Sequence, residues 1–262
     1  MIVFLGGGRI TAALVAGLRL AKFEEPILVH DRNADKLQRL KKEYRVAIES
    51  DLRRAVKLAR VLVVAVRPNA VRGLLQEIGE VKRSVTAISL AAGIPLSKLR
   101  GTLGPSVRWA RAMPSPVCRS GHGLTALTFD RRFPRSARRD VMNLFEKVGS
   151  VLQIPESKFD AFTVTYSSSH GYHALATLAG AAEKLGLTRK VALTAAAHAL
   201  ADGIVAWREG GISLDALLSE SATPGGIARA AMAAMDSSGY ARSIARGLRA
   251  GMARARGNAR LE

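Results

Sequence analysis

The regular alternation of short apolar runs with helical segments over residues 1–154 limits most strongly what this chain can fold into. The clearest run is "VLVVAV" at 61–66, which is almost entirely β-branched. A continuous apolar run of this kind is typical of a strand that is buried on both faces. Because parallel strands need a long crossover, strands that alternate with helices indicate βαβ units. The sequence therefore predicts an α/β fold with a parallel sheet in residues 1–154.

The pattern changes near Pro155, and residues 155–262 contain no convincing strand. Segments such as "KVALTAAAHALADGIVAW" are helical in composition and period, and they are rich in Ala and Gly. Small side chains allow helices to approach closely but build a thin core. We therefore predict an all-α dimerisation domain over residues 155–262. It would bury its surface against a second copy in a homodimer, and a higher oligomer is compatible with this surface.

The composition excludes some classes of protein. With one cysteine, Cys118, the chain cannot form an internal disulfide, which favours the cytoplasm. The sequence contains no run of the roughly 18 apolar residues that a membrane span needs, so no membrane partner is expected. The net charge of +19 suggests a nucleic-acid partner, but aromatic residues make up only 5%, and none lies among Arg242, Arg246, Arg249 and Arg256, which fall on one helix face. Nucleic acid is therefore an unlikely partner, whereas the positive charge would favour a phosphorylated small ligand.

Metal or thiol chemistry has little support. The histidines have no metal-ligand partners at useful spacing, so no metal is expected; those considered are His122, His170, His173 and His198. Cys118 lies near His122, but a small buried thiol is the simpler interpretation.

A glycine-rich stretch, "FLGGGRIT", follows the first strand and opens the first helix. Gly6 and Gly8 match the first two glycines of GxGxxG/A, which permit a tight turn and close approach of a pyrophosphate to the helix N-terminus. Thr11 stands where the third Gly or Ala would be expected. Because a strand, a helix and a second strand surround the motif, we predict a Rossmann-type dinucleotide-binding domain over residues 1–154.

The end of the second strand, "HDRNADK", bears on which dinucleotide is bound. Asp31 could bind the ribose hydroxyls of NAD, or it could simply be a turn residue. Arg32, with Asn33, could instead hold the 2′-phosphate of NADP. We favour NADP (as NADPH) because the chain is strongly positive, and NAD stays open.

Several stretches, in the right order and over nearly the whole chain, resemble the pyrroline-5-carboxylate reductase family. They are "VAVRPNAV" (64–71), "ISLAAGIPLSKL" (88–99), "VRWARAMPSP" (107–116), "FEKVGSVLQIPESKFDAFT" (145–163), "GLTRKVALTAAAHALADG" (186–203) and the segment 222–255. The resemblance implies an NAD(P)H-dependent imine oxidoreductase that reduces 1-pyrroline-5-carboxylate to L-proline in proline biosynthesis. It also implies cofactor contacts, at Gly6, Gly8, Arg9 and Ile10 (pyrophosphate), Arg32 (adenosine phosphate), Val66, Arg67 and Pro68 (cleft), Ala92 and Gly93 (nicotinamide ribose), and Met113, Pro114 and Ser115 (nicotinamide).

The first departure from the family lies in "YSSSHGY" (166–172), where the family has serine-glycine-serine-glycine-proline-alanine-tyrosine. Ser168 and Tyr172 are kept, two glycines have become Ser167 and Ser169, and the proline has become His170. The pocket should therefore be smaller or differently shaped. We predict catalytic roles for Ser168 and His170 and a substrate contact at Ser169. The alternative for the serines is a helix N-cap.

The second departure lies in "TPGGIA" (223–228), where the family's threonine after the glycines is missing. The substrate contacts predicted in this turn are Thr223, Gly225, Gly226, Ile227 and Ala228. Loss of one buried hydroxyl that meets a ligand costs roughly 1–3 kcal/mol. Three hypotheses stay open: the family's own reaction, reduction of a different cyclic imine with help from His170, and an inactive paralogue that only binds the dinucleotide.

Overall fold

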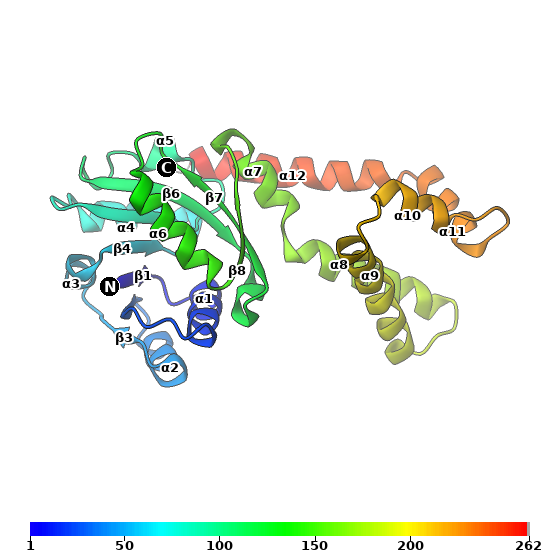
Figure 1. The fold of residues 1–262 in the computed structure, drawn as a ribbon, viewed down its shortest axis with the longest axis horizontal. Coiled ribbons are helices and arrows are strands. Elements are labelled where there is room, and N and C mark those ends of the chain that lie inside the picture. The colour runs from blue at the N-terminus through cyan, green and yellow to red at the C-terminus, as the bar shows by residue number, and fades with distance from the viewer. Residues whose placement is uncertain (261–262) are drawn as a thin grey trace. The chain divides into compact units, whose positions relative to one another are not determined.

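The computed structural model describes residues 1–260 (Figure 1). The chain divides into two compact units, of which the first comprises Met1–Tyr166 with the segment from Ala250 onward and the second comprises Ser167–Arg249. The sequence predicts a different division, into a cofactor domain of residues 1–154 and a helical domain of residues 155–262. This division stays a prediction, and residues 261–262 lie outside the described range. The last helix belongs to both units, because it begins in the second and ends in the first.

The first unit contains an eight-stranded sheet in the order β3-β2-β1-β4-β5-β6-β7-β8. The strands are β1 (Ile2–Leu5), β2 (Ile27–His30), β3 (Ala47–Ile48), β4 (Val61–Val64), β5 (Val85–Ser89), β6 (Val107–Pro114), β7 (Gly123–Phe129) and β8 (Gly149–Gln153). Strands β1 to β6 are parallel to their neighbours, but β7 pairs with β6 in the antiparallel direction. The β6–β7 connection is too short for a parallel crossover, so the chain reverses there. The predicted α/β fold is confirmed; β7 and β8, which are parallel to each other, form the edge that runs opposite to the other strands.

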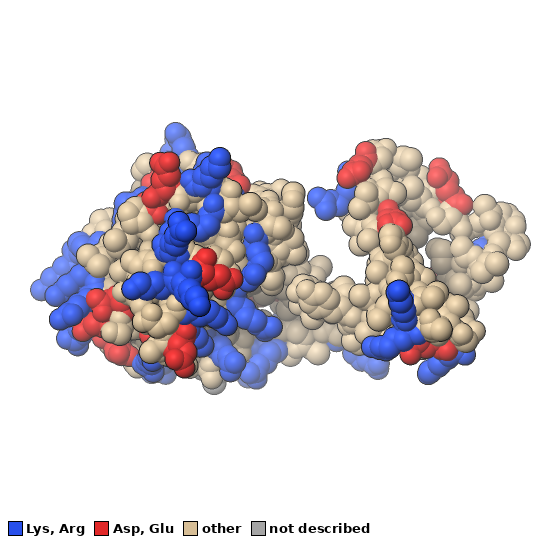
Figure 2. Space-filling model, turned by 90° about the horizontal axis from the view of Figure 1, so that it is seen from below, with Lys and Arg blue, Asp and Glu red and all other residues tan. Residues whose placement is uncertain are grey.

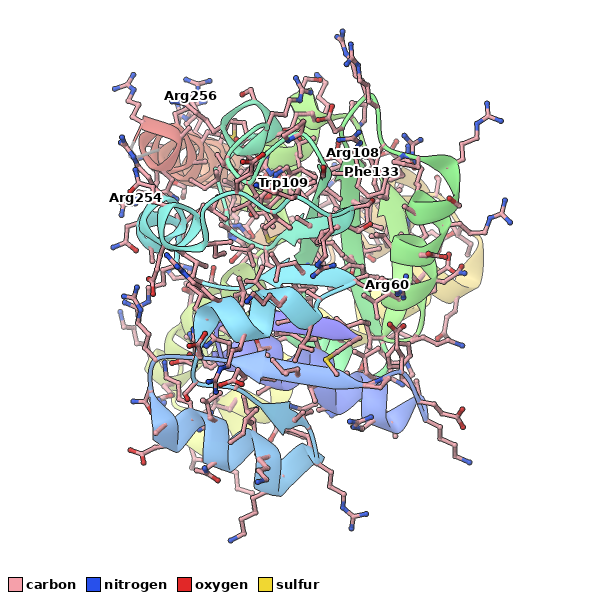
Figure 3. The ribbon with its side chains drawn as sticks, turned by 90° about the vertical axis from the view of Figure 1, so that its left-hand side faces the viewer. Arg60, Arg108, Trp109, Phe133, Arg254 and Arg256 are labelled. Atoms are coloured by element: carbon pink, nitrogen blue, oxygen red, sulfur yellow. The ribbon has the colours of Figure 1, made fainter. Side chains whose placement is uncertain are left out.

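Helices cover both faces of this sheet. They are α1 (Arg9–Leu20), α2 (Ala34–Tyr44), α3 (Leu52–Leu58), α4 (Val71–Ile78), α5 (Leu96–Leu99), α6 (Arg135–Glu146) and α7 (Glu156–Thr165), with the 3₁₀ turns η1 (Pro68–Ala70) and η2 (Pro116–Ser120). Two helix starts are fixed by side-chain caps: Asn33 accepts a hydrogen bond from the N–H of Lys36, and Asp51 accepts one from the N–H of Arg54. Two apolar clusters, one on each face, sandwich the sheet, and Trp109 of β6 lies within one of them (Figure 3).

The strand order places a crevice at the middle of the sheet. The chain moves from β1 to β2 on one side and later returns to β4 on the other, so β1 lies between them. In open sheets of this kind the loops after such strands diverge, and ligands bind at that point. The register pairs Leu5 with both His30 and Val64, so the loops after β1, β2 and β4 begin side by side.

The second unit is helical throughout its described residues. It contains α8 (Ser168–Lys184), α9 (Arg189–Gly210), α10 (Leu214–Ser221), α11 (Ile227–Ser237) and the first part of α12 (Tyr240–Arg260). Its buried cluster consists of Ala179, Ala192 and Ala196 with a few partly buried neighbours, as expected for an Ala-rich domain. Large apolar side chains remain exposed, among them Val191, Ile204, Val205, Trp207, Leu214 and Ile244. This surface is well suited to burial in a homo-oligomer. None of the described helices has the length and hydropathy required to cross a membrane.

An ion-pair cluster holds the amino-terminal edge of the sheet. Arg60, labelled in Figure 3, contacts Glu25 at 2.8 Å and Asp140 of α6 at 3.3 Å, and the amino terminus lies 3.2 Å from Glu25. Burial by itself would raise the pKa of Glu25, but the hydrogen bonds and charges of Arg60 and the terminal amine outweigh burial and lower it. A carboxylate with a lowered pKa stabilises the fold above its unfolded pKa, and this contribution is lost as pH falls through the folded value.

Replacement of Glu25 by glutamine should therefore lower the free energy of unfolding by about 1 kcal/mol at pH 7. The difference from the wild type should shrink as the pH falls below the ordinary glutamate value of 4.5, because protonation then removes the same charge from both proteins. Urea unfolding at pH 7 and pH 3.5 measures this. Glu24→Gln, at the neighbouring exposed carboxylate, is the control and should have little effect at either pH. An equal loss at both pH values for Glu25→Gln would contradict the electrostatic explanation.

Candidate functional site

The carboxyl edge of the sheet brings together several residues predicted from the sequence. Gly6 follows β1, Arg32 follows β2 and Val66 follows β4, and all three line one cavity of about 150 Å³. Its other lining residues are Leu5, His30, Asp31, Ala70 and Leu74. His30 was not predicted; it is buried, and its Nδ1 lies 2.9 Å from the carbonyl oxygen of Glu49. The cavity has the position expected for the adenosine end of a dinucleotide.

The glycine loop beside this cavity has the geometry that its sequence predicts. Gly6 has a φ of +111°, and a Cβ there would lie 2.7 Å from the carbonyl oxygen of Ala65, so only glycine fits. Gly8 is the N-cap of α1, and a Cβ built on it would meet no atom within 4 Å. The space above Gly8 is therefore open to a phosphate at the start of α1.

Thr11 explains how the loop accommodates the departure at its third motif position. Its buried hydroxyl donates a hydrogen bond of 2.5 Å to the carbonyl oxygen of Gly6. The side chain therefore closes the loop on itself instead of obstructing the packing of α1. Thr11 therefore leaves the open space at Gly8 unobstructed.

Asp31 holds the glycine loop with both of its carboxylate oxygens and also lines the cavity. Its Oδ2 accepts a hydrogen bond of 2.7 Å from the N–H of Gly7, and its Oδ1 accepts one of 2.8 Å from the N–H of Asn33. Of the two interpretations that the sequence left open, the turn residue agrees with these contacts. Arg32 is exposed and pairs with Glu77 of α4 at 2.5 Å, so its guanidinium lies at the rim of the cavity.

The other cofactor candidates lie on the same edge or next to it. Arg9 and Ile10 form the first turn of α1, and Arg67 and Pro68 begin η1. A third group lies at the end of β6 and just after it, and consists of Met113, Pro114 and Ser115. The Ser115 hydroxyl accepts a hydrogen bond of 3.1 Å from the N–H of Val117, so it caps η2.

Sequence reasoning missed Arg111, which organises the end of β6. Its side chain is 1% exposed, and its two terminal nitrogens contact Glu156 at 2.9 Å and Asp160 at 2.7 Å. Its guanidinium also lies 4.3 Å from the ring centre of Phe159. All three partners belong to α7, so Arg111 fixes this helix to the strand that ends at Met113 and Pro114. The available signal was an arginine between the alanines of a strand whose neighbouring residues are apolar.

The end of α12 was also missed. Asn258 donates a hydrogen bond of 3.1 Å to the carbonyl oxygen of Ala92. Gly93 has a φ of +80°, and a Cβ there would lie 2.6 Å from the carbonyl oxygen of Ala255. Ala255 lies between Arg254 and Arg256, which Figure 3 labels on this helix. The turn at Ala92 and Gly93, which is predicted to lie near the nicotinamide ribose, therefore packs against the last turns of α12.

The residues predicted to bind substrate lie in the second unit, at two helix starts. Ser167 is the N-cap of α8, but its hydroxyl lies 2.7 Å from that of Ser169 and makes no capping bond. Ser168, Ser169 and His170 are exposed in the first turn. The N-cap interpretation therefore holds for the backbone of Ser167 and not for the serine side chains.

The second helix start is that of α11. Gly225 has a φ of +76°, and the N–H of Gly226 donates a hydrogen bond of 3.0 Å to the carbonyl oxygen of Thr223. Ile227 is 92% exposed, and Ala228 follows it in the first turn. The turn leaves the first N–H groups of α11 available to an anion.

Metal and thiol chemistry find no geometric basis in residues 1–260. No three His, Cys, Asp or Glu side chains gather there in a way that could hold a metal ion. Burial raises the pKa of the Cys118 thiol to about 12, so the thiol stays protonated at neutral pH.

Comparisons with known proteins identify both halves of the chain. Residues 1–93 match the family described as NADP oxidoreductase coenzyme F420-dependent, and residues 156–258 match pyrroline-5-carboxylate reductase dimerisation. The pyrroline-5-carboxylate reductase of Mycobacterium leprae is 32% identical over 209 residues, which cover 76% of this chain and 71% of that protein. A pyrroline-5-carboxylate reductase structure from Coxiella burnetii superposes with a TM-score of 0.85 at 25% identity, covering 98% of this chain and 97% of that one. The Plasmodium falciparum pyrroline carboxylate reductase, solved with NADP bound, has a TM-score of 0.86 at 18% identity, covering 98% and 97%.

Proposed function

The chain belongs to the pyrroline-5-carboxylate reductase family, and on that premise we propose that it reduces the ring C=N of 1-pyrroline-5-carboxylate to L-proline with NAD(P)H. The observation that carries the proposal is the glycine cradle, which is open above Gly8 and lies next to the cavity at Arg32. The helical part of the same chain matches the family's dimerisation domain. Residues 1–154 then serve the cofactor and residues 155–262 serve the substrate and the dimer.

The nicotinamide, when bound, supplies the hydride for the ring carbon, and the protein supplies binding, orientation and exclusion of water. Gly6, Gly8, Arg9 and Ile10 would hold the pyrophosphate, with N–H groups of the first turn of α1 as donors. Arg32 would hold the 2′-phosphate, because its exposed guanidinium lies at the rim of the cavity. The cleft walls and the nicotinamide end are assigned to Val66, Arg67, Pro68, Ala92, Gly93, Met113, Pro114 and Ser115.

The substrate carboxylate is assigned to the first turn of α11. Its N–H groups can donate to an anion, and the helix dipole adds to the attraction. The residues involved are Thr223, Gly225, Gly226, Ile227 and Ala228, with Ser169 from α8. Because Ala228 has no hydroxyl to meet the ring nitrogen, His170 takes that part, and Ser168 stands beside it as the serine that the family keeps.

We infer a homodimer formed through the C-terminal helices. The support is the exposed apolar surface of the second unit together with the match to a dimerisation domain. A stable monomer in light scattering would contradict this inference. The low cysteine content favours the cytoplasm.

The reaction is tested by oxidation of NADPH with 1-pyrroline-5-carboxylate and, separately, with a six-membered cyclic imino acid. The family's own reaction predicts turnover with the five-membered ring. Turnover with the six-membered ring alone would move the assignment to a different cyclic imine. Tight NADPH binding without turnover of either would identify the chain as an inactive, dinucleotide-binding paralogue.

Replacement of His170 by alanine should lower kcat by about tenfold to a hundredfold, because a group that donates to the ring nitrogen contributes to proton transfer. The binding of NADPH should not change. His173→Ala is the matched control, since His173 lies one turn further along α8 and is also exposed. Equal rates for the wild type and His170→Ala would remove His170 from the reaction.

Arg32→Gln tests the choice of cofactor. We expect the Kd of NADPH to rise about tenfold, because a charge-assisted hydrogen bond to phosphate is lost, while the Kd of NADH changes little. Titration of each cofactor by quenching of protein fluorescence measures this. Glu77→Gln is the companion variant: it releases Arg32 from its ion pair, so NADPH should bind equally or more tightly. A parallel loss of both cofactors in Arg32→Gln would contradict a role at the 2′-phosphate.

A further inference from the structure

A second hollow, which shares no lining residue with the cofactor cavity, lies beside the first turns of α1. Its volume is about 290 Å³. Ala12 and Ala13 are buried and form the floor, because their small side chains leave room above the helix. The remaining lining residues are Arg9, Arg39, Glu43, Tyr44, Pro116 and Arg119, from α1, α2 and η2.

Positive charge dominates this hollow. Three arginines line it against a single carboxylate, Glu43, whose Oε1 accepts a hydrogen bond of 2.5 Å from the hydroxyl of Tyr44. Within residues 1–260, none of the three arginines makes an ion pair, whereas Arg60 and Arg111 do. Lys and Arg also outnumber Asp and Glu on the face of the molecule that Figure 2 shows, where α2 lies.

The cations of this hollow come from separate elements. Arg9 lies on α1, Arg39 on α2 and Arg119 on η2, and all three line the hollow. Side chains from separate elements can surround a ligand more readily than a row of cations on one helix can.

Local structure accounts for Arg119, which lies in the last turn of η2, but not for Arg9. Cations are favourable near helix C-termini. Lys57 has this placement in the last turn of α3, and it lines another basic hollow. Arg9 has the opposite placement, at the first residue of α1, where the helix dipole opposes a positive charge. An anion held between Arg9, Arg39 and Arg119 would offset that cost.

We propose that this hollow is a second anion site, which takes a dianion of the phosphate class, and that its occupation weakens cofactor binding through Arg9. The proposal rests on the proposed function in one respect, the assignment of Arg9 to the pyrophosphate. Arg9 lies between the glycine loop and the hollow, so it can serve one anion at a time. The hollow as a whole has three arginines and one glutamate, so two positive charges are in excess. A dianion matches that excess.

The experiment measures NADPH affinity against inorganic phosphate, with potassium chloride at equal ionic strength as the reference. We expect phosphate to raise the Kd of NADPH several-fold more than chloride does. The double variant Arg39→Gln/Arg119→Gln should require about tenfold more phosphate for the same effect, and its NADPH affinity without phosphate should be that of the wild type. Arg53→Gln/Lys57→Gln removes the same charge from the other basic hollow and should keep the wild-type response.

Two results would overturn the proposal. An undiminished phosphate effect in Arg39→Gln/Arg119→Gln would mean that phosphate competes at the cofactor's own phosphate positions. Equal effects of phosphate and chloride on the wild type would leave only ionic screening. A second readout needs no cofactor. The wild-type protein should broaden the ³¹P resonance of phosphate, and the double variant should not. If NADPH fails to bind at all, the proposed function falls while this second readout still decides the anion site. Arg119→Gln alone serves if the double variant misfolds.

Discussion

Replacement of Arg111 by methionine is expected to lower the free energy of unfolding of the first unit by about 3–5 kcal/mol. Arg111 is almost completely buried, and the variant would leave Glu156 and Asp160 without their shared cation. Both carboxylates are only partly exposed, at 34% and 28%, so water can compensate only in part. The stacking on Phe159 would be lost as well.

Chemical denaturation followed by circular dichroism measures this loss. Arg108→Met is the matched control, because Arg108 lies on the same strand and, among the described residues, bonds only to the carbonyl groups of Pro105 and Val107; its loss should be about 1 kcal/mol or less. The triple variant Arg111→Met/Glu156→Gln/Asp160→Asn should recover part of the stability, since no buried charge is then left unpaired. A loss for Arg111→Met no larger than for Arg108→Met would show that the ion pairs contribute little.

Gly93→Ala is expected to weaken NADPH binding by tenfold or more and to destabilise the protein. The φ of +80° costs an alanine about 1–2 kcal/mol. The new Cβ would also lie 2.6 Å from the carbonyl oxygen of Ala255, which is backbone and cannot rotate away. Either the turn after β5 or the end of α12 must shift, and the turn is the part assigned to the nicotinamide ribose.

The matched control is Gly73→Ala in α4, where an added Cβ meets nothing within 4 Å and should stabilise the helix by about 0.5–1 kcal/mol. Asn258→Ala removes only the hydrogen bond to Ala92 and should cost about 1 kcal/mol. NADPH titration and thermal unfolding distinguish the three. Wild-type NADPH affinity in Gly93→Ala would mean that the turn does not position the cofactor.

The sequence predicted those features that depend on neighbouring residues. Gly6 and Gly8 identified the phosphate cradle because the tight turn requires glycine at Gly6 and a pyrophosphate needs open space at Gly8. The apolar runs at the start of the chain and at 61–66 identified β1 and β4 because a strand that is buried on both faces is apolar throughout. The thin alanine core of the second unit followed from composition in the same way.

The site features that sequence reasoning missed are long-range contacts. Asn258 and Ala92 are 166 residues apart, and Arg111 and Glu156 are 45 apart, so no local pattern joins them. The hollow at Arg39 and Arg119 is assembled from three separate elements. The reversal of β7 was also missed, because the length of a connection limits strand direction only once the strands are placed side by side.

Asp31 shows most clearly where the two kinds of information separate. The sequence alone determined the fold class, the dinucleotide cradle and the resemblance of nearly the whole chain to one family, because each rests on local pattern or on residue order. It left Asp31 and Arg32 as competing determinants of the cofactor. Only the tertiary structure decided that both oxygens of Asp31 accept backbone N–H groups, from Gly7 and Asn33. A hydrogen bond across 24 residues depends on how β1 and β2 lie in the sheet, and that arrangement is a property of the folded chain.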